Sequence, residues 1–493
     1  MVARVERVTA RILVAVAACA GALLAWRAWK GPFQLGPLWI RSPFTLEAVF
    51  ALSVGGLLAI ACGRRADAES IFPRWTRLPL LFFALVLTVL AFAPNLHDPF
   101  LSDDYILTTH ATLVPAVLAR TFVTPGGDGA FRPLGHVWFG LIHSFAGTNP
   151  LPWHCCSLLL HLLNCALLFA LAGALWENPL LSFTSAFLFG LHGTRVETVV
   201  WTAANFDLLA CAFSFAAALC VLRPQARRSR WAVVLALVLL IAAILCKESA
   251  YATPIVILGL AEAAGRLRDR TVREFLAGSV AVCVAMFAWR WCLFRGPGGY
   301  IDPSTGQPAI LSLRLIGSLK AVFVRLWTIL LFPINWTATG SAWLAAAVLL
   351  GCAAVVFLLW ASGGLRPWVV LSLLGTTACA MVPVLHLALV GESLLGARIF
   401  YLPAVPFFIL AGHAVASVAS RRRAILGLAA LAFSTVMMLE HNLAFWHRAA
   451  LVADRVCTAA AGGGPVSPTS YALPGILSFG NGFRECVELK HAK

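Results

Sequence analysis

Apolar runs of roughly 17 to 22 residues recur along the chain, and each is long enough to cross about 30 Å of hydrocarbon as an α-helix. Backbone groups inside a bilayer must bond internally, so the pattern predicts an all-α polytopic bundle. We expect thirteen spans, at residues 12–29, 44–62, 78–94, 154–175, 180–193, 203–222, 231–246, 249–264, 275–294, 342–360, 368–388, 402–419 and 424–440.

Composition agrees with a membrane protein. Of 493 residues, 60% are hydrophobic and 12% are charged, which is far more apolar than an average soluble domain. The net charge of +16 could indicate nucleic acid. The basic residues nevertheless cluster in short loops between apolar runs, as the positive-inside rule describes. We therefore expect membrane lipid, and no nucleic acid, as a partner.

Arginine-rich loops give the predicted orientation. The arginines that mark the cytoplasmic side most clearly are Arg4, Arg7 and Arg11 at the N-terminus and Arg421–Arg423 before the last apolar run. Counting spans between them places the loop 95–153 outside. Residues 313–333 are apolar enough to cross but carry Arg314, Lys320 and Arg325. We interpret this segment as an outer interfacial or re-entrant helix, because a crossing there would reverse every later assignment.

The polar residues divide the chain into three predicted regions. Residues 1–77 form an N-terminal two-helix membrane addition, because the informative polar residues begin after it. Residues 78–441 form the core, which includes a long outer loop at 95–153 that carries amphipathic helices and an outer interfacial segment at 295–341. Residues 442–493 contain several glycines and prolines, which predicts a short, loosely ordered outer tail.

Most of the 14 cysteines fall inside predicted spans, where a thiol is a small apolar filler. Their spacing is not that of a metal site, and we expect no metal. Cys457 and Cys486 differ, because both belong to the outer tail. Oxidising conditions there would permit a disulfide between them.

Asp103 and Asp104 stand in the first long polar stretch of the core, in a chain that contains few acids. They are the best candidates for chemistry. A structural alternative is that Ser102 or Asp103 caps a short helix predicted over residues 105–119.

Polar residues inside or beside the spans extend this candidate site. Ionisable groups in a bilayer usually face the bundle interior. His154, Ser157, His161 and Asn164 fall within roughly 80° of one another on a helix, a stripe that interhelical hydrogen bonding would explain equally well. Further polar clusters follow on the outer side: His192 to Asp207, Lys247 with Glu248, and Glu392 to Tyr401. Their convergence on one face favours a reaction site over isolated snorkelling or paired groups.

In order and spacing these residues form a set of motifs. The motifs are Asp103-Asp104, Arg132-Pro133-Leu134, Leu159 to Asn164, His192 to Glu197, Ala204 to Leu209, Lys247-Glu248 and Ala397 to Pro403. Together they resemble the C-type superfamily of membrane glycosyltransferases, and in particular the transmembrane and tetratricopeptide-repeat O-mannosyltransferases and their bacterial relatives. The resemblance covers residues 78–450. The chain departs from the usual residues at Gly193, Arg195, Asn205 and Ala397, and we expect no repeats after residue 450.

The resemblance implies transfer of a sugar, a mannose-like hexose, from a polyprenyl-phosphate carrier to a protein or glycan acceptor. The reaction would be inverting and metal-independent, without a cofactor, at the periplasmic face of a bacterial inner membrane. Asp103 would be the base, and Asp104 would orient either this base or the acceptor. Arg398 would clamp the phosphate, and Lys247 would assist it. The supporting residues would be Arg132, His161, Asn164, His192, Glu197, Asp207, Glu248 and Tyr401.

Three other functions stay open at this point. A ligase or polymerase of lipid-linked glycans would also use an outer-face polyprenyl carrier. A flippase or transporter of a lipid-linked sugar would need charges near the midplane and corresponding broken helices. A degenerate scaffold protein would account for the substituted motif positions.

Overall fold

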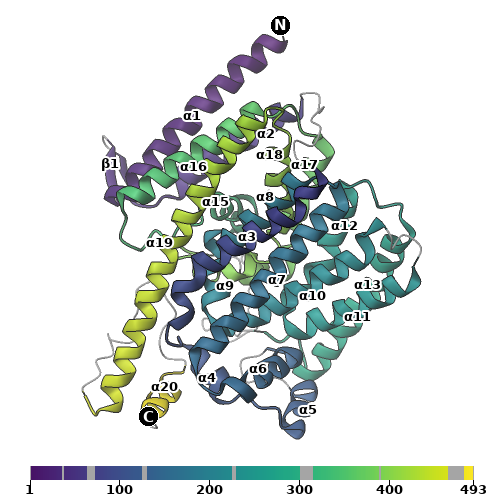
Figure 1. Cartoon of the computed structure of the whole chain (residues 1–493), viewed down its shortest axis with the longest axis vertical. Helices are drawn as coiled ribbons and strands as arrows, with labels where there is room; N and C mark the ends of the chain where they lie inside the picture. The colour runs from purple at the N-terminus through teal and green to yellow at the C-terminus, as the bar shows by residue number, and fades with distance from the viewer. Residues whose placement is uncertain are drawn as a thin grey trace.

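The computed structural model describes residues 2–35, 38–63, 73–124, 130–224, 229–299, 315–387, 390–464 and 482–491. These residues are almost entirely helical (Figure 1). Among these residues, β1 (Phe33–Leu35) and β2 (Leu38–Ile40) are strands that pair in antiparallel register. The predicted class, an all-α polytopic membrane protein, is confirmed.

A helix lies in each of the thirteen predicted spans. Their bounds are α1 (Val2–Lys30), α2 (Phe44–Cys62), α3 (Arg77–Phe92), α7 (Pro150–Trp176), α8 (Pro179–Leu191), α10 (Asn205–Leu222), α11 (Arg230–Cys246), α12 (Thr253–Ala263), α13 (Arg270–Phe294), α16 (Ala342–Ala361), α17 (Pro367–Cys379), α18 (Val405–Ala416) and α19 (Arg421–Ala461). Within the described ranges, eight helices are long and apolar enough to cross a membrane.

The other five helices, α8, α11, α12, α17 and α18, are shorter than these eight. Helices α17 and α18 are also clearly shorter than the spans predicted for them. The span predicted at 368–388 stops at Cys379, and residues Val382–Leu387 form a 3-10 helix that contains Pro383, whose ring cannot continue an α-helix. The span predicted at 402–419 begins only at Val405, because residues 401–404 form turns.

Short elements connect the long helices. The α-helical ones are α4 (Asp103–Thr109), α5 (Pro115–Val123), α6 (Pro133–Ala146), α9 (Val196–Val200), α14 (Leu315–Lys320), α15 (Leu326–Leu331) and α20 (Phe483–His491). The 3-10 turns are η1 (Arg74–Thr76), η2 (Ala93–His97), η3 (Gly193–Arg195), η4 (Thr202–Ala204), η6 (Glu248–Ala252), η9 (Val382–Leu387) and η10 (Ala397–Phe400), and η8 (Ala321–Arg325) is a π-turn.

The outer loop forms a layer at one end of the bundle. Helices α4, α5, α6 and α20 gather there, opposite the N-terminus (Figure 1). The single helix predicted over 105–119 is wrong, because α4 stops at Thr109 and α5 starts at Pro115. Proline takes the first position of a helix readily and disfavours helical backbone in the residue before it.

Helix α19 crosses the whole molecule (Figure 1). It continues to Ala461, so the prediction of a loose tail from residue 442 is wrong for residues 442–461. This stretch is rich in alanine and contains no proline or glycine before Gly462, a composition that favours helix. The predicted disulfide is confirmed: Cys457 on α19 is bonded to Cys486 on α20.

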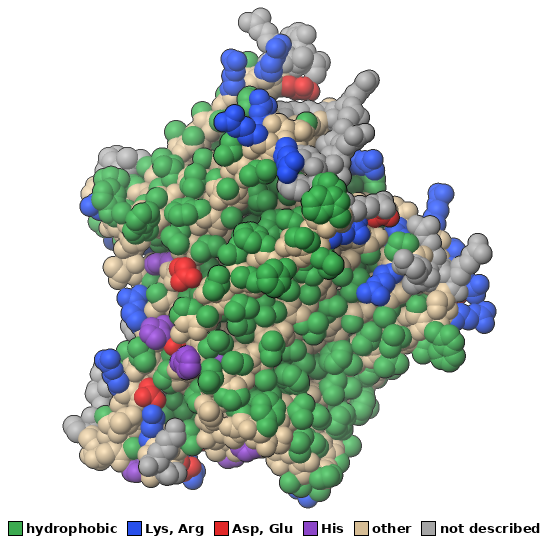
Figure 2. Space-filling view, in the orientation of Figure 1, with side chains coloured by type: hydrophobic (Ala, Val, Ile, Leu, Met, Phe, Trp, Pro, Cys, Tyr) green, Lys and Arg blue, Asp and Glu red, His purple; other side chains and the backbone are tan. Residues whose placement is uncertain are grey.

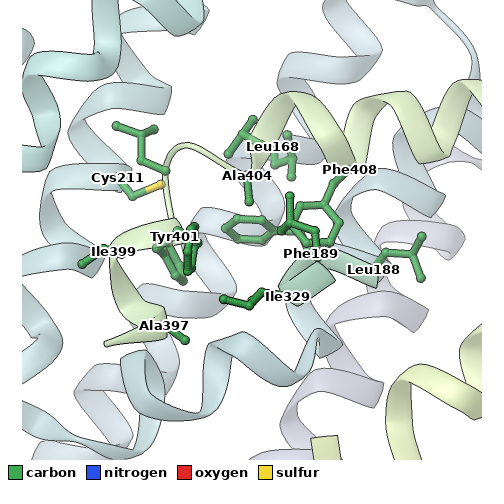
Figure 3. Close-up of a cluster of buried hydrophobic side chains, with 14 of the residues drawn as sticks. Leu168, Leu188, Phe189, Cys211, Ile329, Ala397, Ile399, Tyr401, Ala404 and Phe408 are labelled. Atoms are coloured by element: carbon green, nitrogen blue, oxygen red, sulfur yellow. The ribbon is translucent and has the colours of Figure 1, made fainter. Parts of the chain in front are cut away.

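The surface shows a broad hydrophobic band, and Lys and Arg side chains gather at the end near the N-terminus (Figure 2). This distribution suits a bundle in a bilayer. Inside the bundle, a buried cluster joins α7, α8, α10, α15 and α18 with the η10 segment (Figure 3). This buried cluster supports the polar residues that form the candidate site.

Candidate active site

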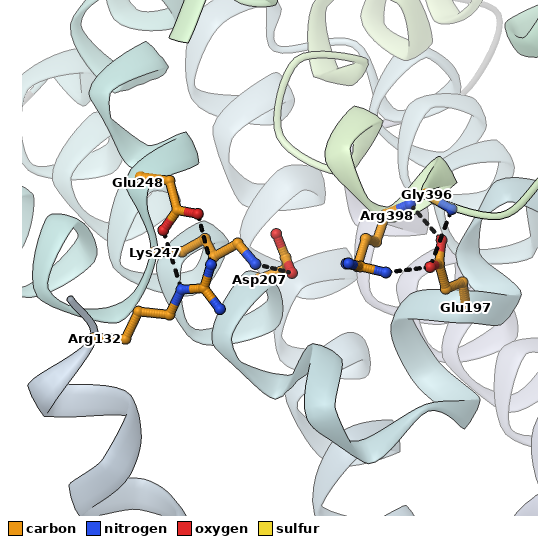
Figure 4. A network of polar contacts seen from close by, with 7 residues as sticks. All are labelled: Arg132, Glu197, Asp207, Lys247, Glu248, Gly396 and Arg398. Carbon is orange, nitrogen blue, oxygen red and sulfur yellow. Dashed lines mark hydrogen bonds and ion pairs between the residues drawn. The ribbon is translucent and has the colours of Figure 1, made fainter. Parts of the chain in front are cut away.

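Three largely buried ion pairs lie close to one another (Figure 4). The pairs are Arg132 with Glu248, Lys247 with Asp207, and Arg398 with Glu197. All six residues are among the predicted site residues. The structure therefore brings together chain segments that are far apart in sequence.

Glu197 holds the segment that carries Arg398. Its carboxylate accepts hydrogen bonds from the backbone N–H of Gly396 at 3.1 Å and of Arg398 at 3.0 Å, and pairs with the Arg398 guanidinium. Gly396 has φ of +87°, a conformation in which only glycine is unstrained. The chain can therefore wrap around the carboxylate, which is buried while the Arg398 side chain stays 17% exposed.

The pairs Arg132 with Glu248 and Lys247 with Asp207 meet at the start of η6. Glu248 accepts two hydrogen bonds from Arg132, at 3.0 Å from Nε and 2.6 Å from Nη2. Burial by itself would raise the pKa of Glu248, but the charges of Arg132 and Lys247 hold that pKa well below its usual range. Lys247 Nζ lies 3.3 Å from Asp207 Oδ2. Two cations and two carboxylates thus form a fixed, electrically balanced group.

Asp104 ties the outer loop to the bundle. Its Oδ1 accepts from the N–H of Ala203 at 2.7 Å and its Oδ2 from the N–H of Leu101 at 3.2 Å. Burial raises the pKa of Asp104 to about 8, and the charge of Asp103 adds to the shift. Ser102 makes no side-chain capping bond to α4, so the capping alternative is wrong for Ser102. Asp103 is partly buried.

Trp201 connects two parts of the candidate site. One is the acidic turn, the segment 101–105 that carries Asp103 and Asp104, and the other is Arg398. The indole N–H of Trp201 donates to the carbonyl of Leu101 at 3.2 Å, and the Arg398 guanidinium lies 4.5 Å from the centre of the Trp201 ring. The backbone of the turn that carries Asp103 and Asp104 and the guanidinium of Arg398 therefore contact the same indole. The sequence placed Trp201 in the right cluster but gave no sign of this role, because an aromatic residue near a bilayer surface is common.

The remaining predicted residues are braced within the protein. His161 lies 2.7 Å from the Tyr401 hydroxyl and 2.9 Å from the Gly190 carbonyl. Asn164 donates to the Leu208 carbonyl at 3.0 Å. These bonds connect α7 with α8, α10 and the segment after Arg398. They are the interhelical hydrogen bonds that the sequence analysis gave as the alternative explanation for the polar residues of α7.

His192 is also braced, at 2.8 Å from the Thr194 hydroxyl and 3.0 Å from the Leu330 carbonyl. These contacts hold η3 against α15, and the site role predicted for His192 stays a prediction. His154, from the same polar stripe as His161, contacts the Asp98 carbonyl at 3.0 Å.

Sequence reasoning missed Arg195. This side chain is fully buried, and its guanidinium lies 4.5 to 5.2 Å from the ring centres of Phe189, Tyr401 and Phe408; Figure 3 shows these three rings together. Its three nitrogens have no hydrogen-bond partner in the described part of the chain. Cation–π contacts hold it instead.

Sequence reasoning also missed a carboxylate in the outer loop. The buried Asp98 accepts from Asn95 at 2.7 Å and pairs with His447 at 2.5 Å. His447 belongs to the stretch of α19 that was predicted to be loose tail. No pattern within the loop itself could have identified this partner.

Across the described ranges, no group of three or more His, Cys, Asp or Glu side chains is placed to hold a metal ion. The expectation of a reaction without metal or cofactor stays a prediction.

Comparisons with known proteins support the motif resemblance. No family model matches the chain. A curated relative, Protein O-mannosyl-transferase Tmtc1 of Drosophila melanogaster, is 28% identical over 159 residues, or 32% of this chain. The match spans only 18% of that relative's length. A solved structure, ArnT from Cupriavidus metallidurans bound to undecaprenyl phosphate, aligns over 83% of this chain and 84% of its own with a TM-score of 0.37 and 15% identity. The resemblance to C-type glycosyltransferases that the motifs predict is thus confirmed as a similarity to an O-mannosyl-transferase.

Proposed function

We propose that this protein is a membrane glycosyltransferase that moves a sugar, a mannose-like hexose, from a polyprenyl-phosphate carrier to an acceptor hydroxyl at the outer face. The motif order and the similarity to an O-mannosyl-transferase support the reaction class. The observation that carries the proposal is the meeting of the acidic turn and Arg398 at Trp201. A base and a phosphate-binding cation at one place are what such a transfer needs.

In the proposed reaction, the acceptor oxygen attacks the anomeric carbon while the bond between that carbon and the phosphate oxygen breaks. The hydroxyl proton passes to Asp103, and the phosphate leaves with the bonding electrons. A single displacement of this kind inverts the anomeric centre. Arg398 binds the leaving phosphate through its planar guanidinium, and Lys247 adds a second positive charge.

Asp104 has a different role from Asp103. Its two backbone hydrogen bonds fix the turn at residues 101–104 against η4, and its raised pKa favours the protonated form at neutral pH. Asp103 then has a neutral neighbour and can stay ionised, ready to accept a proton. Asp104 is a positioning residue, and Asp103 is the proposed catalytic residue.

The test uses purified full-length protein in liposomes with a radiolabelled mannosyl-phosphoryl-polyprenol and synthetic Ser/Thr peptides or glycans as acceptors. Asp103→Asn should lower transfer by about 10² to 10⁴-fold, the usual contribution of a general base, and should leave binding of polyprenyl phosphate unchanged. Glu274→Gln, on the exposed surface of α13, is the control. Retained turnover in Asp103→Asn contradicts the proposal, and movement of the labelled lipid without a covalent product favours a flippase.

A further inference from the structure

We infer that the disulfide-tethered helix α20 is a clamp that positions the acidic turn, and that transfer depends on this clamp. The acidic turn is the segment 101–105 that carries Asp103 and Asp104. The inference on transfer rests on the proposed function. The inference on structure stands on the contacts alone.

Gly482, directly before α20, lies against the acidic turn. A Cβ built on Gly482 would be 2.3 Å from the carbonyl oxygen of Ser102 and 3.3 Å from Tyr105 Cβ. The φ of Gly482 is +79°, where L side chains are strained. Glycine is therefore required here for two independent reasons, close approach and backbone conformation.

Three further contacts hold α20 in place. Cys486 is bonded to Cys457, and both are fully buried. Lys490 Nζ lies 2.6 Å from Asp454 on α19, while Glu485 lies 3.7 Å from His110 at the end of α4. Helix α20 is thus attached to α19 and rests on α4, and Figure 1 shows it beside α4 at the outer end.

The acidic turn needs such outside support. Helix α4 has seven residues, and helices this short are unstable in isolation. Ser102 precedes it with φ of 54°, a conformation that persists only where the surroundings impose it. Asp104 fixes the turn from the bundle side, through Leu101 and Ala203. Helix α20 and Gly482 confine it from the other side.

The position of Asp103 follows from this arrangement, because Asp103 lies between Ser102 and Asp104 in the confined segment. A base must stay within hydrogen-bond reach of its proton, and a displacement of about 1 Å can lower a rate about 100-fold. Releasing α20 should therefore lower transfer without weakening donor binding at Arg398.

The first variant is Gly482→Ala, and its matched control is Gly463→Ala. Gly463 also has a positive φ, +73°, but a Cβ there would meet nothing within 4 Å. Both variants carry similar backbone strain, and only Gly482→Ala presses on the acidic turn. The rate of transfer is divided by the number of molecules that bind a synthetic polyprenyl phosphate. This rate should fall about 10 to 100-fold in Gly482→Ala, with an unchanged donor KM. In the control it should stay within threefold of wild type.

A second variant, Cys457→Ser with Cys486→Ser, removes the tether without adding bulk. Wild-type protein treated with a dithiol should lose activity in parallel and regain it on reoxidation. Hydrogen exchange measured by mass spectrometry reports the clamp even if no transfer is found. Amides of residues 101–109 should exchange at least 10-fold faster in both variants, while those of α6 should not change.

Unchanged exchange at residues 101–109 overturns the clamp itself. Faster exchange with unchanged transfer overturns its link to the reaction. A rise in transfer overturns the positioning role as well, because α20 would then cover the site. An inactive wild-type protein with the expected exchange contradicts the proposed function and leaves the structural clamp supported.

Discussion

Replacing Glu197 with glutamine should disable the Arg398 segment. The Glu197 carboxylate is buried and accepts from two backbone N–H groups and one guanidinium. A glutamine side chain has one oxygen for these donors. Its NH₂ group would face at least one N–H of Gly396 or Arg398, so a buried donor would lose its acceptor and Arg398 would lose its counter-charge.

The expected magnitude follows from these contacts. Removing one partner of a buried ion pair costs about 3 to 5 kcal/mol. Arg398 is 17% exposed, so part of its charge can return to water, and we expect the lower end, about 3 kcal/mol. We expect this loss to fall on the ordered position of Arg398 that would bind the donor. Since 1.4 kcal/mol corresponds to about a factor of ten, binding of polyprenyl phosphate should then weaken by about 100-fold.

The assay is equilibrium binding of a synthetic polyprenyl phosphate to detergent-solubilised protein, combined with thermal unfolding of the same samples. Glu274→Gln is the control, because Glu274 and Arg270 also pair, at 2.6 Å, but are 37% and 58% exposed. Such a pair is worth about 0 to 1 kcal/mol. Binding by Glu197→Gln within threefold of wild type would refute the reasoning, as would an equal loss in both variants.

Three other changes test separate parts of the structure. Burial raises the pKa of Asp104 to about 8 from its ordinary 3.8. The stability that Asp104 contributes is therefore full below pH 3.8 and is lost as pH rises through 8. Between pH 5 and pH 8.5 the melting temperature of wild type should fall relative to that of Asp104→Asn, which thermal scans at both pH values would show. Glu47→Gln removes the carboxylate that lies 3.3 Å from Arg325, with both side chains buried, and should cost about 3 to 5 kcal/mol; a double-mutant cycle with Arg325→Met should show coupling above about 1 kcal/mol. Gly259→Ala would place a Cβ 1.6 Å from Thr376 Oγ1 between α12 and α17; it should destabilise by about 1 to 3 kcal/mol, and Thr376→Ala should recover part of the loss in thermal unfolding.

The positions of the helices could be predicted from the sequence because each apolar run is a local signal. Their lengths could not always be predicted. The run that ends α17 looks continuous, yet the chain turns into a 3-10 helix around Pro383. The end of α19 was missed because the glycines and prolines from Gly462 onward suggest a loose tail, although the alanine-rich stretch before them favours helix.

The charged residues of the candidate site could be selected from the sequence, but the partners of these residues could not. Charged residues in an apolar chain stand out, so Glu197, Arg398 and Asp104 could be selected from the sequence. Their partners could not, because Glu197 and Arg398 are 201 residues apart and no local pattern links them. Glu47 was missed because it is a single charge next to an apolar run, where a snorkelling group looks the same. Arg195 was missed because the sequence shows it only as a departure from the usual motif residue.

The ion pairs decide which cation meets the donor. The side chains of Arg132 and Lys247 are only 7% and 8% exposed and are held by carboxylates, while Arg398 is 17% exposed and lies on the face of Trp201. In the proposed reaction, a phosphate would meet the Arg398 guanidinium first, and the two less exposed cations would act on it through the field they create. Because Glu197 fixes Arg398 from behind, the guanidinium is oriented before the donor arrives. Preorganised charge of this kind stabilises a developing anion without a reorganisation cost at the moment of reaction.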